Sequence, residues 1–171
     1  RCAHLAPELS ALLHRGDEVE LLCLTKAQRL IHRTSPVGDP TVPVSVSSPD
    51  VPRFRATQLE VIGLVQDFGA ACAGALTNKQ GDILALWSSV SEQRDGKEKE
   101  WAAGLPAVLF TPWVDMVIQR LEAAGGAGAA VEPPQVPVLD AELVPLPLAK
   151  AAQYGLPQEW VARLVEYDPE R

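Results

Sequence analysis

The chain has 171 residues, of which 47% are hydrophobic and 22% charged, and this suits one compact domain or one and a half. Its net charge of −7, without a basic stripe, argues against nucleic-acid binding, which requires cations that neutralise phosphates. No apolar run approaches the roughly 20 residues that span a membrane. Three cysteines are an odd, sparse set, which argues against a disulfide framework and predicts a reducing compartment. The chain begins at Arg1 rather than Met, so we expect a piece of a longer protein.

The first half of the chain predicts mainly strands. Leucines that share one face predict a short helix over residues 5–14. Alternating apolar residues then predict strands over residues 18–24, 29–34 and 56–64. The segment 35–52 is rich in proline, serine and valine, which predicts edge strands and loops.

A second group of strands and one helix follow. We expect a hairpin whose second strand, residues 83–87, is apolar throughout and buried on both faces, and then an exposed charged loop over 92–100. A strand over 104–110 should lead into a helix that begins at Thr111 and Pro112, since threonine is a good N-cap and proline fits the first helical turn. This helix should run to about Ala124, and its apolar face should point inward: Val114, Val117, Ile118 and Leu121.

Residues 125–135 are rich in glycine, alanine and proline, which is typical of a linker, and they form the best domain boundary. Beyond it we expect a strand over 136–146 and helices over 148–154 and 157–165. Residues 1–124 therefore form one predicted domain, and residues 136–171 begin a second. Several short strands followed by one helix fit a six-stranded barrel.

The stretch from Asp67 to Trp87 reads as a small-residue loop, a strand, a polar turn at Gly81 and another strand. It resembles the nucleophile loop of trypsin-like proteases of the HtrA/Deg type, which reads Gly-Asn-Ser-Gly-Gly-Pro-Leu before a hairpin. On this chain that loop falls on residues 70–76, where Gly74 and Leu76 match. The serine position falls on Cys72. Alanine stands at the asparagine position (Ala71), at the first two glycine positions (Ala70 and Ala73) and at the proline position (Ala75).

Further fragments resemble the degenerate second protease domain of the double-length chloroplast Deg protease of plants and algae, which also carries PDZ domains. They are residues 52–57, 59–62, 67–69, 74–77 and 86–89 and, at the expected start of a PDZ domain, 154–160, whereas residues 15–19 and 104–108 resemble the second barrel of HtrA/Deg protease domains in general. The resemblance implies an all-β-dominated fold, namely a trypsin-like six-stranded antiparallel barrel closed by a C-terminal helix and followed by the start of a PDZ-like unit. It also implies a chloroplast location and a parent protein that acts as a serine-type endopeptidase on damaged or unfolded proteins.

Catalysis by such a protease requires a nucleophile, a base, an orienting carboxylate and an oxyanion hole. The resemblance implies that the histidine and aspartate come from a first barrel before Arg1. We interpret the three histidines of this chain as structural or surface residues, namely His4, His14 and His32. We expect an inert Cys72 within a degenerate oxyanion loop composed of Gly69, Ala70, Ala71, Cys72, Ala73 and Gly74. No set of residues with metal-ligand spacing and no nucleotide-binding loop is present, so no metal and no cofactor are expected.

The preferred prediction is a non-catalytic protease-like domain with a structural, assembly or substrate-binding role in protein quality control. Its partners would be unfolded or damaged proteins or peptides, and formation of a homo-oligomer is left open. One alternative is an active cysteine- or serine-type hydrolase barrel that obtains its histidine and aspartate from upstream sequence. Another is a β-rich interaction domain unrelated to proteases.

Overall fold

The structure is a computed structural model that describes residues 4–25, 27–44, 59–68, 72–94, 97–125, 133, 135 and 146–167. For Cys72 and for residues 91–94 and 97–99 it describes the backbone alone. The chain divides into two compact units, Arg1–Ala141 and Glu142–Arg171, which are treated separately below.

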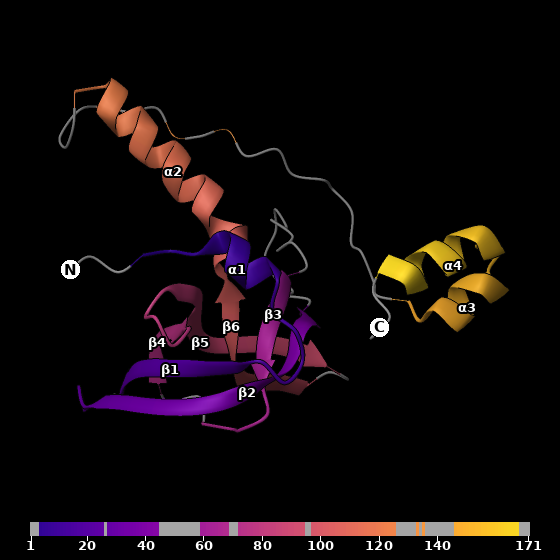
Figure 1. The fold of residues 1–171 in the computed structure, drawn as a ribbon, viewed down its shortest axis with the longest axis horizontal. Coiled ribbons are helices and arrows are strands. Elements are labelled where there is room, and N and C mark those ends of the chain that lie inside the picture. Colours follow the sequence, from indigo (N-terminus) through magenta and orange to yellow (C-terminus); the bar gives the residue numbers. More distant parts are fainter. Residues whose placement is uncertain are drawn as a thin grey trace. The chain divides into compact units, whose positions relative to one another are not determined.

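The first unit is built on a closed barrel of six strands in the order β1-β2-β3-β6-β5-β4 (Figure 1). All neighbouring strands pair antiparallel. The predicted six-stranded antiparallel barrel is therefore confirmed. Its strands are β1 (Glu18–Thr25), β2 (Leu30–Val44), β3 (Leu59–Leu64), β4 (Cys72–Thr77), β5 (Ile83–Arg94) and β6 (Lys97–Pro106).

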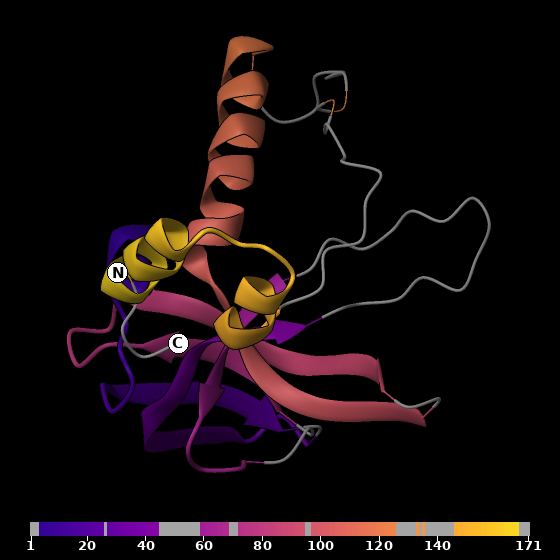
Figure 2. The same cartoon turned by 90° about the vertical axis from the view of Figure 1, so that its right-hand side faces the viewer.

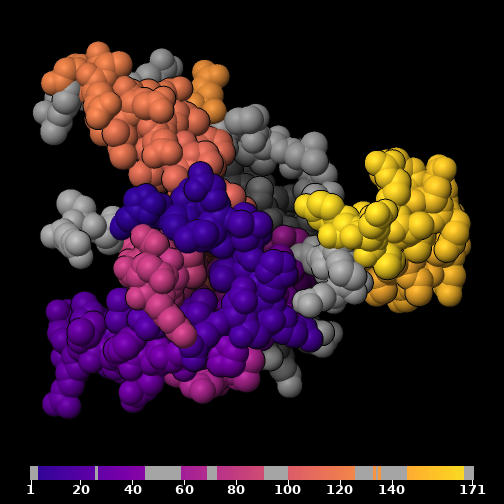
Figure 3. Space-filling model, viewed as in Figure 1, coloured from indigo at the N-terminus to yellow at the C-terminus, as the bar shows by residue number. Residues whose placement is uncertain are grey.

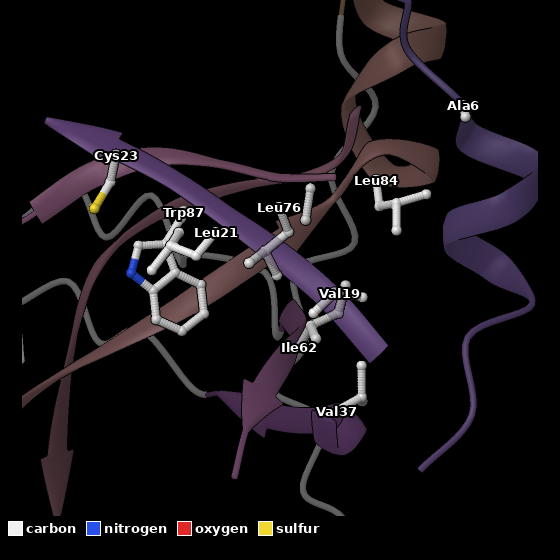
Figure 4. Packing of buried hydrophobic residues seen from close by; sticks show 10 residues of the cluster. Ala6, Val19, Leu21, Cys23, Val37, Ile62, Leu76, Leu84 and Trp87 are labelled. Atoms are coloured by element: carbon white, nitrogen blue, oxygen red, sulfur yellow. The ribbon is translucent and has the colours of Figure 1, made fainter. Parts of the chain in front are cut away.

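Alternation of side chains along the strands produces the barrel core. In β1, Val19, Leu21 and Cys23 are buried, whereas Leu22 and Leu24 on the other face are exposed. Figure 4 shows how the inward side chains pack. The buried members of this main core cluster are Ala6, Val19, Leu21, Cys23, Val37, Ile62, Leu76, Leu84, Ala85 and Trp87.

The start of β5 departs from strict alternation, because the neighbouring residues Leu84 and Ala85 are both buried. Leu84, Ala85 and Trp87 are buried, but Leu86 is 44% exposed, so the prediction that residues 83–87 are buried on both faces was wrong. The polar turn before this strand is confirmed, because Gly81 has a φ of +87°, a conformation that favours glycine.

The hairpin of β5 and β6 is much longer than the sequence predicted. The two strands pair continuously from Ala85↔Pro106 to Arg94↔Lys97, so the predicted charged loop at 92–100 is strand on both sides of the turn (Figure 2). Val90 and Trp101 are partners in this register and pack against a second buried cluster. That contact stabilises the base of the hairpin, and charged residues beyond it do not prevent strand pairing because hydrogen bonds are made by the backbone.

Two helices join at one side of the barrel, α1 (Pro7–Ala11) and α2 (Ala107–Ala123). The Ser10 hydroxyl of α1 accepts a hydrogen bond from the Val108 backbone N–H at 3.1 Å and donates one to the Pro7 carbonyl oxygen at 2.8 Å. Ser10 therefore caps the first turn of α2, and Figure 3 shows α1 (indigo) against the base of that helix (orange).

The beginning of α2 differs from the prediction by one turn. Residues 107–110 are helical rather than extended, and Thr111 lies inside the helix, where its hydroxyl donates a hydrogen bond to the Ala107 carbonyl oxygen at 2.7 Å. The predicted N-cap at Thr111 was therefore wrong: Pro106 occupies the N-cap position of α2, and the Val108 N–H in the first turn is satisfied by Ser10, which lies 98 positions before Val108 in the sequence.

The apolar face of α2 is not turned inward. Val114, Val117 and Ile118 are 39–46% exposed, although the sequence predicted them to be buried. Figures 1 and 2 both show α2 extending away from the strands, so only its first turns are close enough to contact the barrel.

The second unit contains the helices α3 (Leu148–Gln153) and α4 (Gln158–Tyr167), which confirms the two helices predicted in this region. Gly155, with a φ of +101°, ends the first of them. The predicted strand over 136–146 lies outside the described residues except for Leu146, which is not in a strand. None of the described helices has the length and apolar composition needed to cross a lipid bilayer.

Candidate functional site

The candidate site lies at the start of β4, where the sequence predicted the nucleophile position. Cys72 is the first residue of β4 and the register partner of Thr25 on β1. Of the predicted loop residues, Ala73 and Gly74 also lie on this strand. Gly69, Ala70 and Ala71 lie outside the described residues, so the predicted geometry of the oxyanion loop remains a prediction.

The two strands beside β4, which are β1 and β5, do not pair with it over the same number of residues. β1 pairs with β4 along the whole strand, from Thr25↔Cys72 to Glu20↔Thr77. β5 pairs with it only as far as Gly74↔Trp87. We call this end of the ladder the β4–β5 fork and define it by Ala73 and Gly74 on one strand and Trp87 and Ser88 on the other.

Beyond the fork, β5 continues from Ser88 to Arg94 and, among the described strands, pairs with β6 alone. Its other edge therefore presents backbone N–H and C=O groups that no described strand satisfies. An edge of this kind can accept an extended polypeptide as an additional strand.

Gly74 permits an unusually close approach of the strands beside the fork. A Cβ atom at this position would lie 2.0 Å from the Leu22 backbone oxygen and 2.7 Å from the Cys23 Cβ atom. Neither distance is compatible with a side chain, so only glycine fits this position without a backbone shift. This steric constraint explains why glycine stands at position 74, which is one of the two positions that match the protease loop.

Trp87 is a feature of the fork that the sequence did not predict. It is the last residue of β5 to pair with β4, its side chain is 3% exposed, and its Nε1–H has no hydrogen-bond partner among the described residues. In the sequence it belongs to an apolar run, which gave no sign that its indole nitrogen would be left unpaired.

The three histidines lie at three separate carboxylates. His4 Nδ1 is 3.4 Å from Asp82, His14 Nδ1 is 3.9 Å from Asp17, and His32 Nε2 is 3.3 Å from Glu20. All three side chains are more than half exposed, which confirms their surface interpretation. Within the described part of the chain, no three histidine, cysteine, aspartate or glutamate side chains are grouped as a metal site.

Known proteases align with most or all of this chain. It is 37% identical over 183 aligned residues to Protease Do-like 7 of Arabidopsis thaliana, and the alignment covers 100% of the chain and 16% of that protein. It is 29% identical to Pro-apoptotic serine protease NMA111 of Saccharomyces cerevisiae, with 94% of the chain and 15% of that protein covered. The protein of the same name from Eremothecium gossypii is 30% identical, with 89% and 14% covered.

These alignments concern a small part of each relative, since the chain spans about one sixth of their length. No family model matches the chain. No solved structure matches it either. The homology and the closed antiparallel barrel nevertheless agree with each other, because trypsin-like proteases are built from barrels of this type. Over its whole length, the chain is homologous to a segment of the Deg/HtrA (Do-like) serine proteases.

Proposed function

We propose that this chain is a non-catalytic, protease-like barrel of a longer Do-like serine endopeptidase, and that it binds extended segments of unfolded or damaged proteins. The observation that carries the proposal is the β4–β5 fork, from which β5 continues with one edge unpaired by any described strand. The homologues support a proteolytic context, and they favour the protease-related interpretations over a β-rich domain unrelated to proteases.

The non-catalytic part of the proposal rests on the residues around Cys72. A thiol can serve as a nucleophile, but it still needs a base within hydrogen-bond reach. Each histidine of the chain lies at a carboxylate of its own and is largely exposed to solvent. The alternative is an active cysteine- or serine-type hydrolase whose histidine and aspartate come from another part of a longer polypeptide.

The remaining organisation is proposed from the resemblance. Residues 125–135 would be a linker, and residues 136–171 would begin a PDZ-like domain. The resemblance also supports a location in the chloroplast. The helices α3 and α4 are compatible with this proposal, since none of their residues is buried within the described part of the second unit and they would need a larger fold to cover them.

Fluorescently labelled casein tests both binding and cleavage by the 171-residue chain. We expect saturable binding without cleavage, and we expect Cys72→Ala to leave binding unchanged. Rapid labelling of Cys72 by a thiol reagent, together with turnover that Cys72→Ala abolishes, would establish the active hydrolase instead.

Proline substitutions locate the binding edge. Backbone N–H groups of successive residues in a strand point to opposite neighbours, so one of Ser88 and Ser89 directs its N–H toward the unpaired edge and the other toward β6. One of the variants Ser88→Pro and Ser89→Pro should therefore lose casein binding while keeping the unfolding midpoint of the parent chain. If both variants bind casein normally, the β5 edge is not the binding site.

A further inference from the structure

Residues 4–10, which we call the N-terminal strap, lead from the start of β5 to the start of α2. The His4 carbonyl oxygen accepts a hydrogen bond from the Ile83 backbone N–H at 2.7 Å, and the Ala6 N–H donates one to the Ile83 carbonyl oxygen at 2.9 Å. Leu5 and Ile83 therefore form an isolated parallel bridge. The strap is thus attached to β5 at a single residue, outside the ring of six strands.

Two buried residues fix the strap. Ala6 is 4% exposed and belongs to the main core cluster, and Ser10 is 6% exposed. The Ser10 hydroxyl accepts a hydrogen bond from the Val108 N–H at 3.1 Å, and the Ser10 backbone N–H donates one to the Ala6 carbonyl oxygen at 3.0 Å. Since one helical turn connects Ala6 with Ser10, the contact with β5 and the contact with α2 should move together.

Helix α2 has few other anchors on the barrel. Ala107 is the only one of its residues that is buried. Val114, Val117 and Ile118 are exposed, and the helix contacts α1 more extensively than it contacts β5 or β6. Figures 1 and 2 show α1 beside the first turns of α2, while the rest of that helix points away from the strands. Within the described part of this unit, the strap is therefore the principal noncovalent contact of α2.

We propose that the strap and the first turn of α2 form one conformational device, which detaches from the barrel as a unit while the six strands stay paired. The ring of strands closes without the strap, so its detachment breaks no strand pairing within the barrel. Segments that are held by few buried contacts open locally at a much lower free energy than the core. A displacement at His4 is thereby transmitted to α2 and to the direction of its exposed apolar face. This inference does not depend on the proposed polypeptide binding.

Native-state hydrogen exchange of the 171-residue chain in increasing urea tests the inference. The amides of Ala6, Ile83 and Val108 report on the two contacts of the strap. We expect their protection factors to agree within about threefold and to lie at least about 100-fold below those of β1 amides, because one local opening exposes all three. Exchange of Val108 while Ala6 and Ile83 stay protected would overturn the coupling. Exchange of all three only together with β1 would overturn the separate opening.

A charged substitution should detach the strap. Ala6→Glu would place a carboxylate among the apolar side chains of the main core cluster, where it loses its hydration. We expect exchange at Ile83 and Val108 to accelerate at least about tenfold, and exchange in β1 to change less than about twofold. The matched control Leu12→Glu adds the same charge beyond the strap, at a side chain that is 65% exposed, and should leave all rates unchanged. Equal acceleration in both variants, or a Val108 rate that Ala6→Glu does not affect, would refute the proposal. If Ala6→Glu fails to fold, the measurement in the unsubstituted chain decides alone.

Discussion

The Ser10→Ala substitution tests whether α2 begins where the structure places it. The Ser10 side chain is 6% exposed, accepts a hydrogen bond from the Val108 N–H at 3.1 Å and donates one to the Pro7 carbonyl at 2.8 Å. Loss of a helix cap costs about 0.5–2 kcal/mol, and a buried donor left without a partner costs about 1–3 kcal/mol. Because Val108 is 39% exposed, water can replace part of the lost bond. We therefore expect a destabilisation of about 1–2 kcal/mol.

Thr111→Ala is the matched control for this prediction. The Thr111 hydroxyl bonds to the Ala107 carbonyl within the helix, and such bonds contribute little or weaken a helix slightly. Since alanine also has the higher helix propensity, Thr111→Ala should change stability by less than about 0.5 kcal/mol. Urea unfolding measures both values, and hydrogen exchange at Val108 should accelerate in Ser10→Ala alone. If Thr111→Ala costs as much as Ser10→Ala, the helix begins at Thr111 and the argument fails.

Two further pairs of substitutions test the barrel. Gly74→Ala should cost about 3 kcal/mol or more, because the added methyl group would meet the Leu22 backbone, whereas Gly104→Ala should cost about 1–2 kcal/mol, because it meets the movable end of the Leu76 side chain. Equal losses of stability in the two glycine variants would contradict the close approach of β1 and β4. Leu21→Ala should cost about 2–5 kcal/mol, but Ile118→Ala less than about 1 kcal/mol, since the first side chain is 1% exposed and the second 46%. A large loss of stability in Ile118→Ala would show that the apolar face of α2 is covered in solution.

Local sequence patterns predicted the parts of the fold that depend on neighbouring residues. The alternation in β1, the turn at Gly81 and the two helices of the second unit all follow from a few adjacent side chains. The beginning of α2 could not be predicted in this way, because the cap comes from Ser10, which approaches Val108 only in the folded barrel.

The candidate site, too, was predicted only where local sequence determines it. The resemblance placed Cys72 in a loop before a hairpin, whereas the structure places it at the first residue of β4, beside Gly74, whose steric role there was not predicted. The fork itself depends on how far β4 and β5 pair, and the sequence of either strand alone does not determine the pairing register. The length of β5 and β6 was missed because the sequence signal was charge, whereas Val90 and Trp101 pack at the base of the hairpin.

The pairing of β1 with both β2 and β4 has a consequence for folding during synthesis. A ribosome that adds about 5–20 residues per second completes β1 and β2 several seconds before β4 has been made. Until then, one side of β1 has no strand to pair with, and the Ala6 and Ser10 positions have no β5 or α2 to contact. The nascent chain therefore exposes the apolar residues Val19, Leu21 and Cys23 throughout this interval, and chaperones that bind such segments should associate with it until β6 closes the barrel.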